Sequence, residues 1–422
     1  MEKPGDLIKV TTDKVVEGIL MPQEADHLVI KLRSGYNIGI DKKKIRKTEI
    51  IKKAENRPEK KIPVADNKKL PSISILHTGG TIASKVDYES GAVYARFSAQ
   101  DLLGMFPELR AIANIRSRQL SNMWSEDMRF PHYNILAKEV EKEARAGSSG
   151  VIITHGTDTM HYTGAALSFA LENLGKPVIL VGAQRSSDRG SSDAALNLLS
   201  AAYYITAARN PGVAICMHDT MSDDNCIIIH GCKARKMHTS RRDAFRPINT
   251  GPVATVNFEK RTITPTEERK LSGDLRLRLF SEKVRVGIVK VHPHMMSEEI
   301  SRYMGYDGVV IEGTGLGHAP VNEIDPYTKE NAKICRAIGE LAKKTVVVMA
   351  SQAVYGRLQM DVYSTGRLLQ KLGVIGTGCD MTPETAFIKL SWLLSNFRKD
   401  AKELYTRDLR GELAERTETY LI

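Results

Sequence analysis

The 422-residue sequence has few cysteines and no apolar run long enough to cross a membrane. Five cysteines, an odd and modest number, argue against a framework of disulfide bonds. The most apolar segment, 194–208, is interrupted by polar residues and is shorter than the ~18 residues that a membrane-spanning helix needs. The first residues also lack the apolar centre of a secretory signal peptide. We therefore expect a cytoplasmic protein.

Two further absences narrow the possible architectures and ligands. The sequence has no internal repeat of roughly 20–50 residues, which excludes a solenoid. It also has no Walker A motif with its phosphate-binding lysine, so we expect no ATP on this chain. The apolar content of 42% and the charged content of 26% are ordinary for a globular protein, and the length predicts two or three domains.

Positive charge is concentrated near the N-terminus. Residues 1–69 carry 17 Lys and Arg against 11 Asp and Glu, a net charge of +6 out of the total of +11. Such an excess attracts phosphate backbones without regard to sequence, which favours contact with nucleic acid. A solvated, lysine-rich segment with no ligand is the alternative, and charge alone does not separate the two.

Residues 1–52 have the pattern of a small basic β domain. Short β-rich pieces at 7–11, 15–20, 27–32 and 37–40 are separated by turn residues, which predicts a small antiparallel barrel or sheet. Residues 53–70 are charged, contain proline and have little apolar content, as is typical of a linker.

From residue 71 onward, apolar strands alternate with amphipathic helices, which is typical of a parallel sheet covered on both faces. We expect an N-terminal α/β domain over 71–262, a charged connection over 263–283 and a smaller α/β domain over 284–422. In the first of these domains, strands are expected at 72–77, 150–154, 177–181 and 212–217, and helices at 99–105, 133–146, 160–174 and 192–208. In the second, strands are expected at 284–291, 308–312 and 345–350, and helices at 330–343, 367–372 and 383–394.

Two short glycine–threonine loops each follow one of the expected strands. The first is Thr78-Gly79-Gly80-Thr81 and the second is His155-Gly156-Thr157-Asp158. Each could be a plain turn or a helix N-cap. However, open α/β sheets place their chemistry at the carboxyl ends of strands, and both loops deliver a threonine there. Two hydroxyls, a carboxylate and a lysine would suffice for hydrolysis of an amide by a threonine nucleophile.

The segments 77–83 (HTGGTIA) and 155–160 (HGTDTM) resemble the two signature loops of the bacterial-type L-asparaginase/glutaminase family. The resemblance extends over residues 71–422 and implies an asparaginase-like α/β body with two domains. It also implies an amidohydrolase in which Thr81 is the nucleophile.

The same resemblance implies a second catalytic group made of Thr157, Asp158 and Lys236. Lys236 lies in the segment 235–239 (RKMHT), which is similar to the lysine-bearing segment of the family. In this scheme the uncharged Lys236 amine, with Asp158 beside it, accepts a proton through Thr157.

The segment 120–128 resembles the part of the family that binds the α-amino and α-carboxylate groups of the substrate. This implies substrate-binding roles for Ser125, Glu126 and Asp127. Glu126 stands where stand-alone asparaginases often have glutamine, which weakens the case for their preference for asparagine. The mobile loop after the nucleophile should supply a tyrosine, and Tyr94 fits better than Tyr88.

A basic β domain in front of an asparaginase-like body resembles the D subunits of archaeal glutamyl-tRNA(Gln) amidotransferases. This likeness implies a glutaminase that supplies ammonia to a partner, the E subunit. The partner would bind ATP and Mg and convert Glu-tRNA(Gln) to Gln-tRNA(Gln), with no cofactor on this chain. It further implies a homodimer of this chain within a heterotetramer, away from any membrane.

Two other functions remain open from the sequence. One is a free-standing L-asparaginase with an appended β domain. The other is a non-catalytic, tRNA-binding scaffold, against which the intact set of Thr81, Thr157, Asp158 and Lys236 argues.

Two other motifs have simpler explanations. Six cysteines and histidines lie within 23 residues, but their spacing fits no common zinc motif, so we expect structural roles and no metal. They are Cys216, His218, Cys226, His230, Cys232 and His238. The glycine-rich segment 313–317 lacks the rest of a dinucleotide-binding motif and predicts a tight turn.

Overall fold

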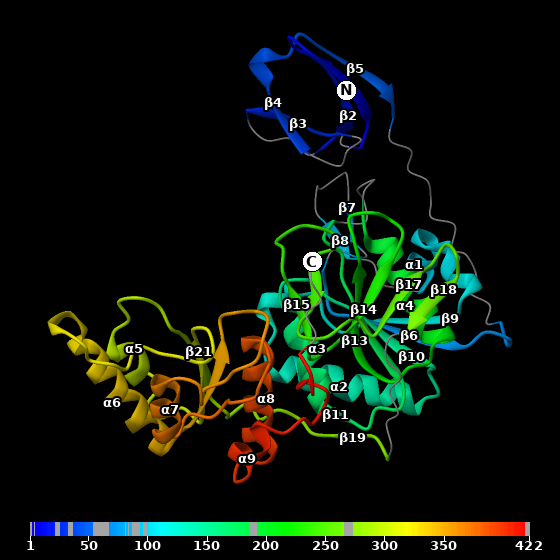
Figure 1. Ribbon diagram of the computed structural model, residues 1–422. Coiled ribbons are helices and arrows are strands. Elements are labelled where there is room, and N and C mark those ends of the chain that lie inside the picture. The colour runs from blue at the N-terminus through cyan, green and yellow to red at the C-terminus, as the bar shows by residue number, and fades with distance from the viewer. Residues whose placement is uncertain are drawn as a thin grey trace.

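The computed structural model describes residues 2–3, 5–21, 26–32, 37–53, 67–80, 82, 84–86, 93–95, 99–185, 192–265 and 273–417. The chain forms a small all-β unit, a large α/β unit and a smaller α/β unit (Figure 1). Among the described residues, no helix combines the length and apolar character needed to cross a membrane.

The N-terminal unit is a five-stranded antiparallel sheet. Its strands are β1 (Leu7–Thr11), β2 (Val15–Leu20), β3 (His27–Lys31), β4 (Asn37–Asp41) and β5 (Lys47–Lys52), in the order β4-β3-β2-β1-β5. Alternate side chains of β1, Ile8 and Val10, are fully buried with Leu20 and Ile30, as the period of two in the sequence predicts. The four expected strands are present. Strand β5 was not predicted, because its lysines and Glu49 give it the composition of a solvated segment.

The large unit is built on an eight-stranded sheet in the order β18-β17-β14-β13-β12-β10-β6-β9. Its parallel strands are β6 (Ser72–His77), β9 (Asn114–Gln119), β10 (Gly150–Thr154), β12 (Pro177–Val181) and β13 (Gly212–His218). The sheet continues in antiparallel fashion through β14 (Cys226–His230), β17 (Ala254–Asn257) and β18 (Thr262–Pro265). The expected α/β fold with a parallel sheet is confirmed, and the sheet as a whole is mixed because of this antiparallel extension.

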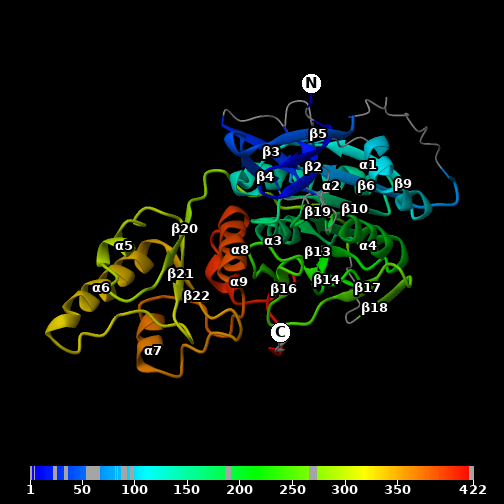
Figure 2. The same ribbon diagram turned by 90° about the horizontal axis from the view of Figure 1, so that it is seen from above.

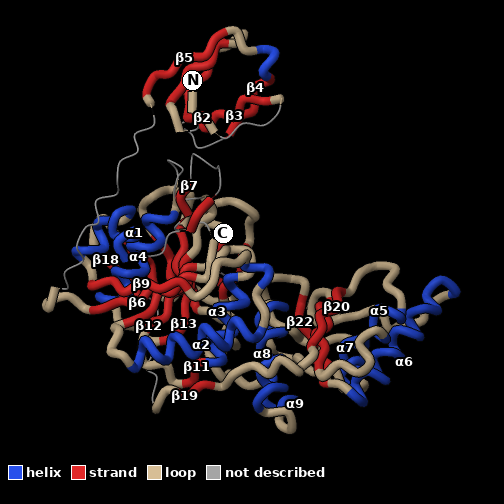
Figure 3. The backbone as a smooth tube through the Cα atoms, turned by 180° about the vertical axis from the view of Figure 1, so that it is seen from behind, coloured by secondary structure: helices blue, strands red, loops and turns tan. Residues whose placement is uncertain are grey.

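Helices cover both faces of this sheet (Figure 3). Helices α2 (Phe130–Arg145) and α3 (Met160–Ala170) pack with strand residues such as Ile153, and α1 (Ala99–Met105) and α4 (Ala194–Ala207) pack with the opposite set, such as Ile152. Helix α3 is shorter than expected, because Leu171–Glu172 leaves it to form β11, which pairs with β19 (Arg276–Leu277).

The smaller unit has a parallel sheet of β20 (Val286–Lys290), β21 (Gly308–Gly313) and β22 (Val346–Ser351). Helices α5 (Ser297–Ser301), α6 (Lys329–Lys344) and α7 (Ser364–Lys371) lie on the outer side, away from the large unit (Figure 2). Helix α8 (Pro383–Asn396) lies between this sheet and α3, followed by α9 (Ala401–Tyr405). The rings of Phe169 and Trp392 lie 5.3 Å apart across that contact, so the two α/β units share one apolar core.

Two small hairpins complete the described strands. Strands β7 (Ser84–Val86) and β8 (Val93–Ala95) form one, and β15 (Ala234–Lys236) and β16 (Phe245–Pro247) form the other. The expected connection over 263–283 contains structure of its own, because β18 reaches residue 265 and β19 lies within it. The division into domains made from the sequence stays a prediction.

Candidate active site

The two glycine–threonine loops leave the same edge of the large sheet. Strands β6 and β10 are parallel neighbours in which His77 pairs with Thr154, so the residues that follow them emerge side by side. The backbone N–H of Thr78 donates to the carbonyl of Thr154 over 3.1 Å, and its hydroxyl donates to the same oxygen over 2.9 Å. Thr81 lies outside the described residues. The described part of the first loop therefore ends at Gly80 and resumes at the buried Ile82.

The first loop depends on glycine at two positions. Gly79 has φ of +128° and Gly80 has φ of +81°, a region that side chains with a Cβ rarely occupy. A Cβ on Gly80 would lie 2.9 Å from the backbone nitrogen of Gly156, and one on Gly79 would lie 2.3 Å from the carbonyl oxygen of Met123. The loop is thus held in backbone contact with the second signature loop on one side and with the 120–128 segment on the other.

Lys236 contacts both other residues of the predicted proton shuttle. Its Nζ donates to Thr157 Oγ1 and to Asp158 Oδ1, each over 2.8 Å. The Lys236 side chain is only 10% exposed, whereas that of Asp158 is 68% exposed. The structure therefore brings together three of the four residues predicted to be catalytic, beside the loop that leads to the fourth.

Lys236 is the last residue of β15, and the turn to β16 is braced by charges. Asp243 accepts hydrogen bonds from Arg241 and from Arg246. Burial alone would raise the pKa of Asp243, but the hydrogen bond from Arg241 and the charges of both arginines lower it overall. The carboxylate therefore stays ionised and fixes the turn between the strands.

The predicted substrate-binding segment is attached to the second loop. Ser125 is buried in a 3₁₀ turn, Ser125–Asp127, and its carbonyl accepts a hydrogen bond of 2.5 Å from the hydroxyl of Thr159. A Cβ on Gly156 would lie 3.0 Å from the Cβ of Ser125, so a larger residue there would push against the substrate-binding segment. Glu126 and Asp127 are exposed, within reach of a ligand from solvent. Their roles in substrate binding stay predictions.

The predicted loop tyrosine is described only by its backbone. Tyr94 lies in β8 and pairs with Lys85 of β7. Tyr88, the alternative, lies outside the described residues.

The histidines of the two signature loops are structural. Burial lowers the pKa of His77 to about 3 and that of His155 to about 4, so both rings are neutral at neutral pH. His155 donates from Nδ1 to the carbonyl of Gly156 over 2.6 Å, which leaves Nε2 to accept from Thr163 over 2.8 Å. These rings hold the loops and are not available as a general base.

Two residues that shape the site were not predicted from the sequence. The hydroxyl of Thr159 attaches the substrate-binding segment, and Gly182 makes room for Thr157, whose Cγ2 would lie 2.7 Å from a Cβ at that position. Thr159 is the second threonine of the HGTDT motif, so the motif could have identified it as a residue of the site. Gly182 follows a buried strand like many turn glycines, and nothing in the sequence distinguishes it.

Four of the six clustered cysteines and histidines lie in β13 and β14, and their structural roles stay a prediction. All five cysteines are free. Cys216 and Cys226 lie on neighbouring strands around Asn197, whose side-chain oxygen is 2.6 Å from His218 Nδ1. No group of three or more potential ligands that could hold a metal ion occurs in the part of the chain that the structure describes.

The glycine-rich segment after β21 is a tight turn, as predicted. Thr314 and His318 exchange two backbone hydrogen bonds of 3.0 Å around Gly315 and Gly317, both of which have positive φ. The turn follows β21 of the smaller sheet.

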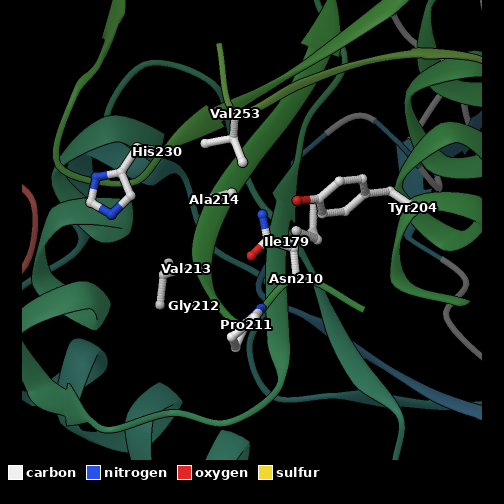
Figure 4. A pocket seen from close by; sticks show the side chains of 9 residues that line it. All are labelled: Ile179, Tyr204, Asn210, Pro211, Gly212, Val213, Ala214, His230 and Val253. Atoms are coloured by element: carbon white, nitrogen blue, oxygen red, sulfur yellow. The ribbon is translucent and has the colours of Figure 1, made fainter. Parts of the chain in front are cut away.

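A small cavity lies near the amino ends of the parallel strands, opposite the ends from which the signature loops leave (Figure 4). Asn210, Pro211 and Gly212 line it where β13 begins, together with Tyr204 of α4 and His230 at the end of β14. Its volume of about 10 Å³ has room for a single water. It lies far along the strands from the signature loops and is not a substrate site.

Three family models together match most of the chain. Residues 2–51 match the GatD N-terminal domain, residues 72–269 the N-terminal domain of asparaginase, and residues 285–406 the glutaminase/asparaginase C-terminal domain. Two solved structures share the fold of the body. The thermostable L-asparaginase from Thermococcus kodakarensis has a TM-score of 0.71 and 29% identity, over 81% of this chain and 99% of that one. L-asparaginase I from Vibrio cholerae has a TM-score of 0.69 and 26% identity, over 82% and 99%.

Curated relatives match nearly the whole chain. The D subunit of glutamyl-tRNA(Gln) amidotransferase from Pyrococcus furiosus is 46% identical over 99% of this chain and 96% of its own length. The protein of the same name from Methanococcus maripaludis is 42% identical over 97% of this chain and 98% of its own length. The relatives share the small N-terminal unit as well as the body, since these alignments leave almost no residue out. The chain therefore belongs to the family of glutamyl-tRNA(Gln) amidotransferase D subunits, whose body has the asparaginase fold.

Proposed function

We propose that this chain is the glutaminase subunit of a tRNA-dependent amidotransferase. It hydrolyses glutamine with Thr81 as nucleophile and supplies the ammonia to a partner protein. The observation that carries the proposal is the contact of Lys236 with both Thr157 and Asp158, next to the loop that leads to Thr81.

In the proposed reaction, the Thr81 hydroxyl attacks the side-chain amide carbon of glutamine. Its proton passes through the Thr157 hydroxyl to an uncharged Lys236 amine, and the same relay returns a proton to the departing ammonia. Water then hydrolyses the ester on Thr81 and releases glutamate. Asp158 stabilises the ammonium form of Lys236 after the transfer, because its carboxylate accepts a hydrogen bond from Nζ over 2.8 Å.

The substrate is proposed to be held by the segment that reaches the second loop through Ser125. Glu126 and Asp127 present carboxylates to solvent beside the site, which suits the α-amino group of an amino acid. Tyr94 is proposed to assist Thr81 from the hairpin that follows it. No cofactor is proposed for this chain.

The proposed partner is the E subunit of the amidotransferase, which would hold ATP and Mg and convert Glu-tRNA(Gln) to Gln-tRNA(Gln). The names of the curated relatives and the match of residues 2–51 to the GatD N-terminal domain support this proposal. The net charge of +6 over residues 1–69 suits an approach to tRNA. We further propose a homodimer of this chain within a heterotetramer, in the cytoplasm.

A free-standing L-asparaginase is the second candidate, favoured by the two solved structures with the same body. Ammonia release from glutamine and from asparagine separates the two functions, measured with and without the co-purified partner and charged tRNA. We expect release from glutamine that depends on the partner complex. A chain that purifies alone and prefers asparagine would contradict the proposal.

A further inference from the structure

Lys236 lies at the end of a strand that is weakly supported by its own sheet. Strand β15 has three residues and pairs with β16 in a two-stranded sheet. Such hairpins are marginally stable by themselves. The lysine side chain adds four flexible carbons, so a short Nζ contact with Thr157 requires that the strand be held from another side.

The other side is the start of α8, which belongs to the smaller α/β unit. Lys233 Nζ lies 2.9 Å from Asp380 Oδ1, and Arg235 Nη2 lies 3.0 Å from Glu384 Oε1. Both pairs are largely shielded from water, with side-chain exposures of 4% and 0% for the first and 23% and 13% for the second. Arg235 and Lys236 are neighbours in the extended strand, so their side chains lie on opposite sides of it, while Lys233 lies in the turn just before the strand.

Two further hydrogen bonds join the residues that flank the hairpin strands to the start of α8. The hydroxyl of Thr385 donates to the carbonyl of Cys232 over 3.0 Å. Asn249, just after β16, donates from its side chain to the carbonyl of Asp380 over 2.8 Å. Both strands of the hairpin are therefore fastened to the residues around the start of α8.

The same helix also packs on the other half of the shuttle. Helix α8 contacts α3, which begins just after Thr157 and Asp158. The rings of Tyr162 and Phe387 meet edge-on at 6.3 Å across this contact. Helix α8 is thus a common support for the strand that carries Lys236 and for the helix behind its two partners.

We propose that Asp380 and Glu384 are positioning residues that clamp the Lys236 strand onto α8 and so set the distance between Lys236 and Thr157. We name Asp380, Glu384 and Thr385 the α8 clamp. The smaller α/β unit then has a role in the reaction as well as in folding. The inference rests on the proposed function, because it concerns the same proton relay.

The size of the expected effect follows from the geometry. Loss of a clamp contact lets the hairpin shift while the substrate segment, which is held by Thr159, stays in place. A displacement of about 1 Å at a reacting group can cost around 100-fold in rate. We therefore expect Glu384→Gln to lower kcat by about 10- to 100-fold and to change KM by less than about twofold.

The test uses the full chain purified with its partner protein, with ammonia release from glutamine and hydrogen exchange over residues 226–247 as readouts. Arg235→Met should behave as Glu384→Gln does, while Arg235→Lys, which keeps the charge, should recover most of kcat. All lowered activities should coincide with faster exchange in the hairpin. Glu384 is partly exposed, so Glu384→Gln should fold even where the buried Asp380→Asn does not.

The matched control is Glu172→Gln. Glu172 pairs with Arg278 and Arg410 at the far end of α3, with 22% side-chain exposure, and also connects the two α/β units. Glu172→Gln should lower the free energy of unfolding about as much as Glu384→Gln does, and should leave kcat within about twofold of wild type. Unchanged kcat and unchanged exchange in Glu384→Gln, or equal losses in the control, would overturn the clamp. A wild-type complex that hydrolyses no glutamine would instead overturn the proposed function. In that case, the rate of hydrogen exchange in the hairpin of Glu384→Gln would still show whether the α8 clamp holds the Lys236 strand.

Discussion

Replacing Lys236 by methionine removes the amine of the proposed relay and keeps an unbranched side chain. In the wild type, Nζ donates to Thr157 Oγ1 and Asp158 Oδ1 over 2.8 Å each, so both contacts disappear together. A positioned acid–base group typically contributes about 100- to 10,000-fold to a reaction. We expect kcat for glutamine to fall by that factor, equivalent to about 2.7–5.5 kcal/mol of transition-state stabilisation.

A double-mutant cycle tests whether the residues act as one unit. If Thr157 and Lys236 pass the same proton, the double variant Thr157→Val/Lys236→Met should be no more than about threefold worse than the poorer single variant. Asp158→Asn should also be crippling, because it removes the carboxylate that stabilises the ammonium form. Independent residues would give losses that multiply.

The assay is ammonia release under saturating glutamine, with kcat and KM determined for each variant. The free energy of unfolding is measured in urea as a control, and the Asp158 variant should be close to wild type because its side chain is 68% exposed. Multiplying losses in the double variant, or a kcat within tenfold of wild type for Lys236→Met, would refute the relay.

Three further predictions concern a backbone contact at the site, a buried ion pair and a buried histidine. Gly80→Ala should abolish most activity, because its Cβ would meet the backbone of the neighbouring loop at 2.9 Å, whereas Gly175→Ala, with open space at that position, should leave kcat unchanged in the same assay. Glu412→Gln should lower the free energy of unfolding by about 3–5 kcal/mol in urea titrations, because it leaves the fully buried Lys389 ammonium without its counter-charge; a loss below about 1 kcal/mol would contradict this. The pKa of His77 is about 3 in the folded chain against 6.5 for the free side chain, so its contribution to stability is complete above pH 6.5 and is lost as the pH falls toward 3. In urea titrations between pH 6 and pH 4, the free energy of unfolding should therefore change less steeply with pH for His77→Asn than for wild type, by up to about 1.4 kcal/mol per pH unit. Equal pH dependence in the two proteins would refute the lowered pKa of His77.

The sequence predicted the regular elements wherever apolar periodicity decided them. Strands β10 and β12 begin and end where the buried runs do, at 150–154 and 177–181. Periodicity failed where tertiary contacts override local pattern. The apolar run 160–174 continues past the end of α3, because Leu171 pairs with β19 across more than 100 residues.

The site was predictable only in part for a similar reason. The loop residues Thr157 and Asp158 are adjacent in the sequence, but Lys236 is 79 residues away, and only the family resemblance linked them. The contact of Arg235 with Glu384 depends on how the hairpin packs against α8, and no local pattern encodes it. Charged pairs between distant segments could therefore be identified only from the structure.

We propose that this chain makes ammonia for a reaction that its partner performs. The most direct measurement is amidation of Glu-tRNA(Gln) by the two-protein complex carrying Thr81→Ala, driven either by glutamine or by an ammonium salt. We expect glutamine-driven amidation to stop and ammonium-driven amidation to continue at the wild-type rate, because the partner needs only ammonia, ATP and the charged tRNA. Retained glutamine-driven amidation, or loss of both reactions in a folded complex, would contradict the proposal.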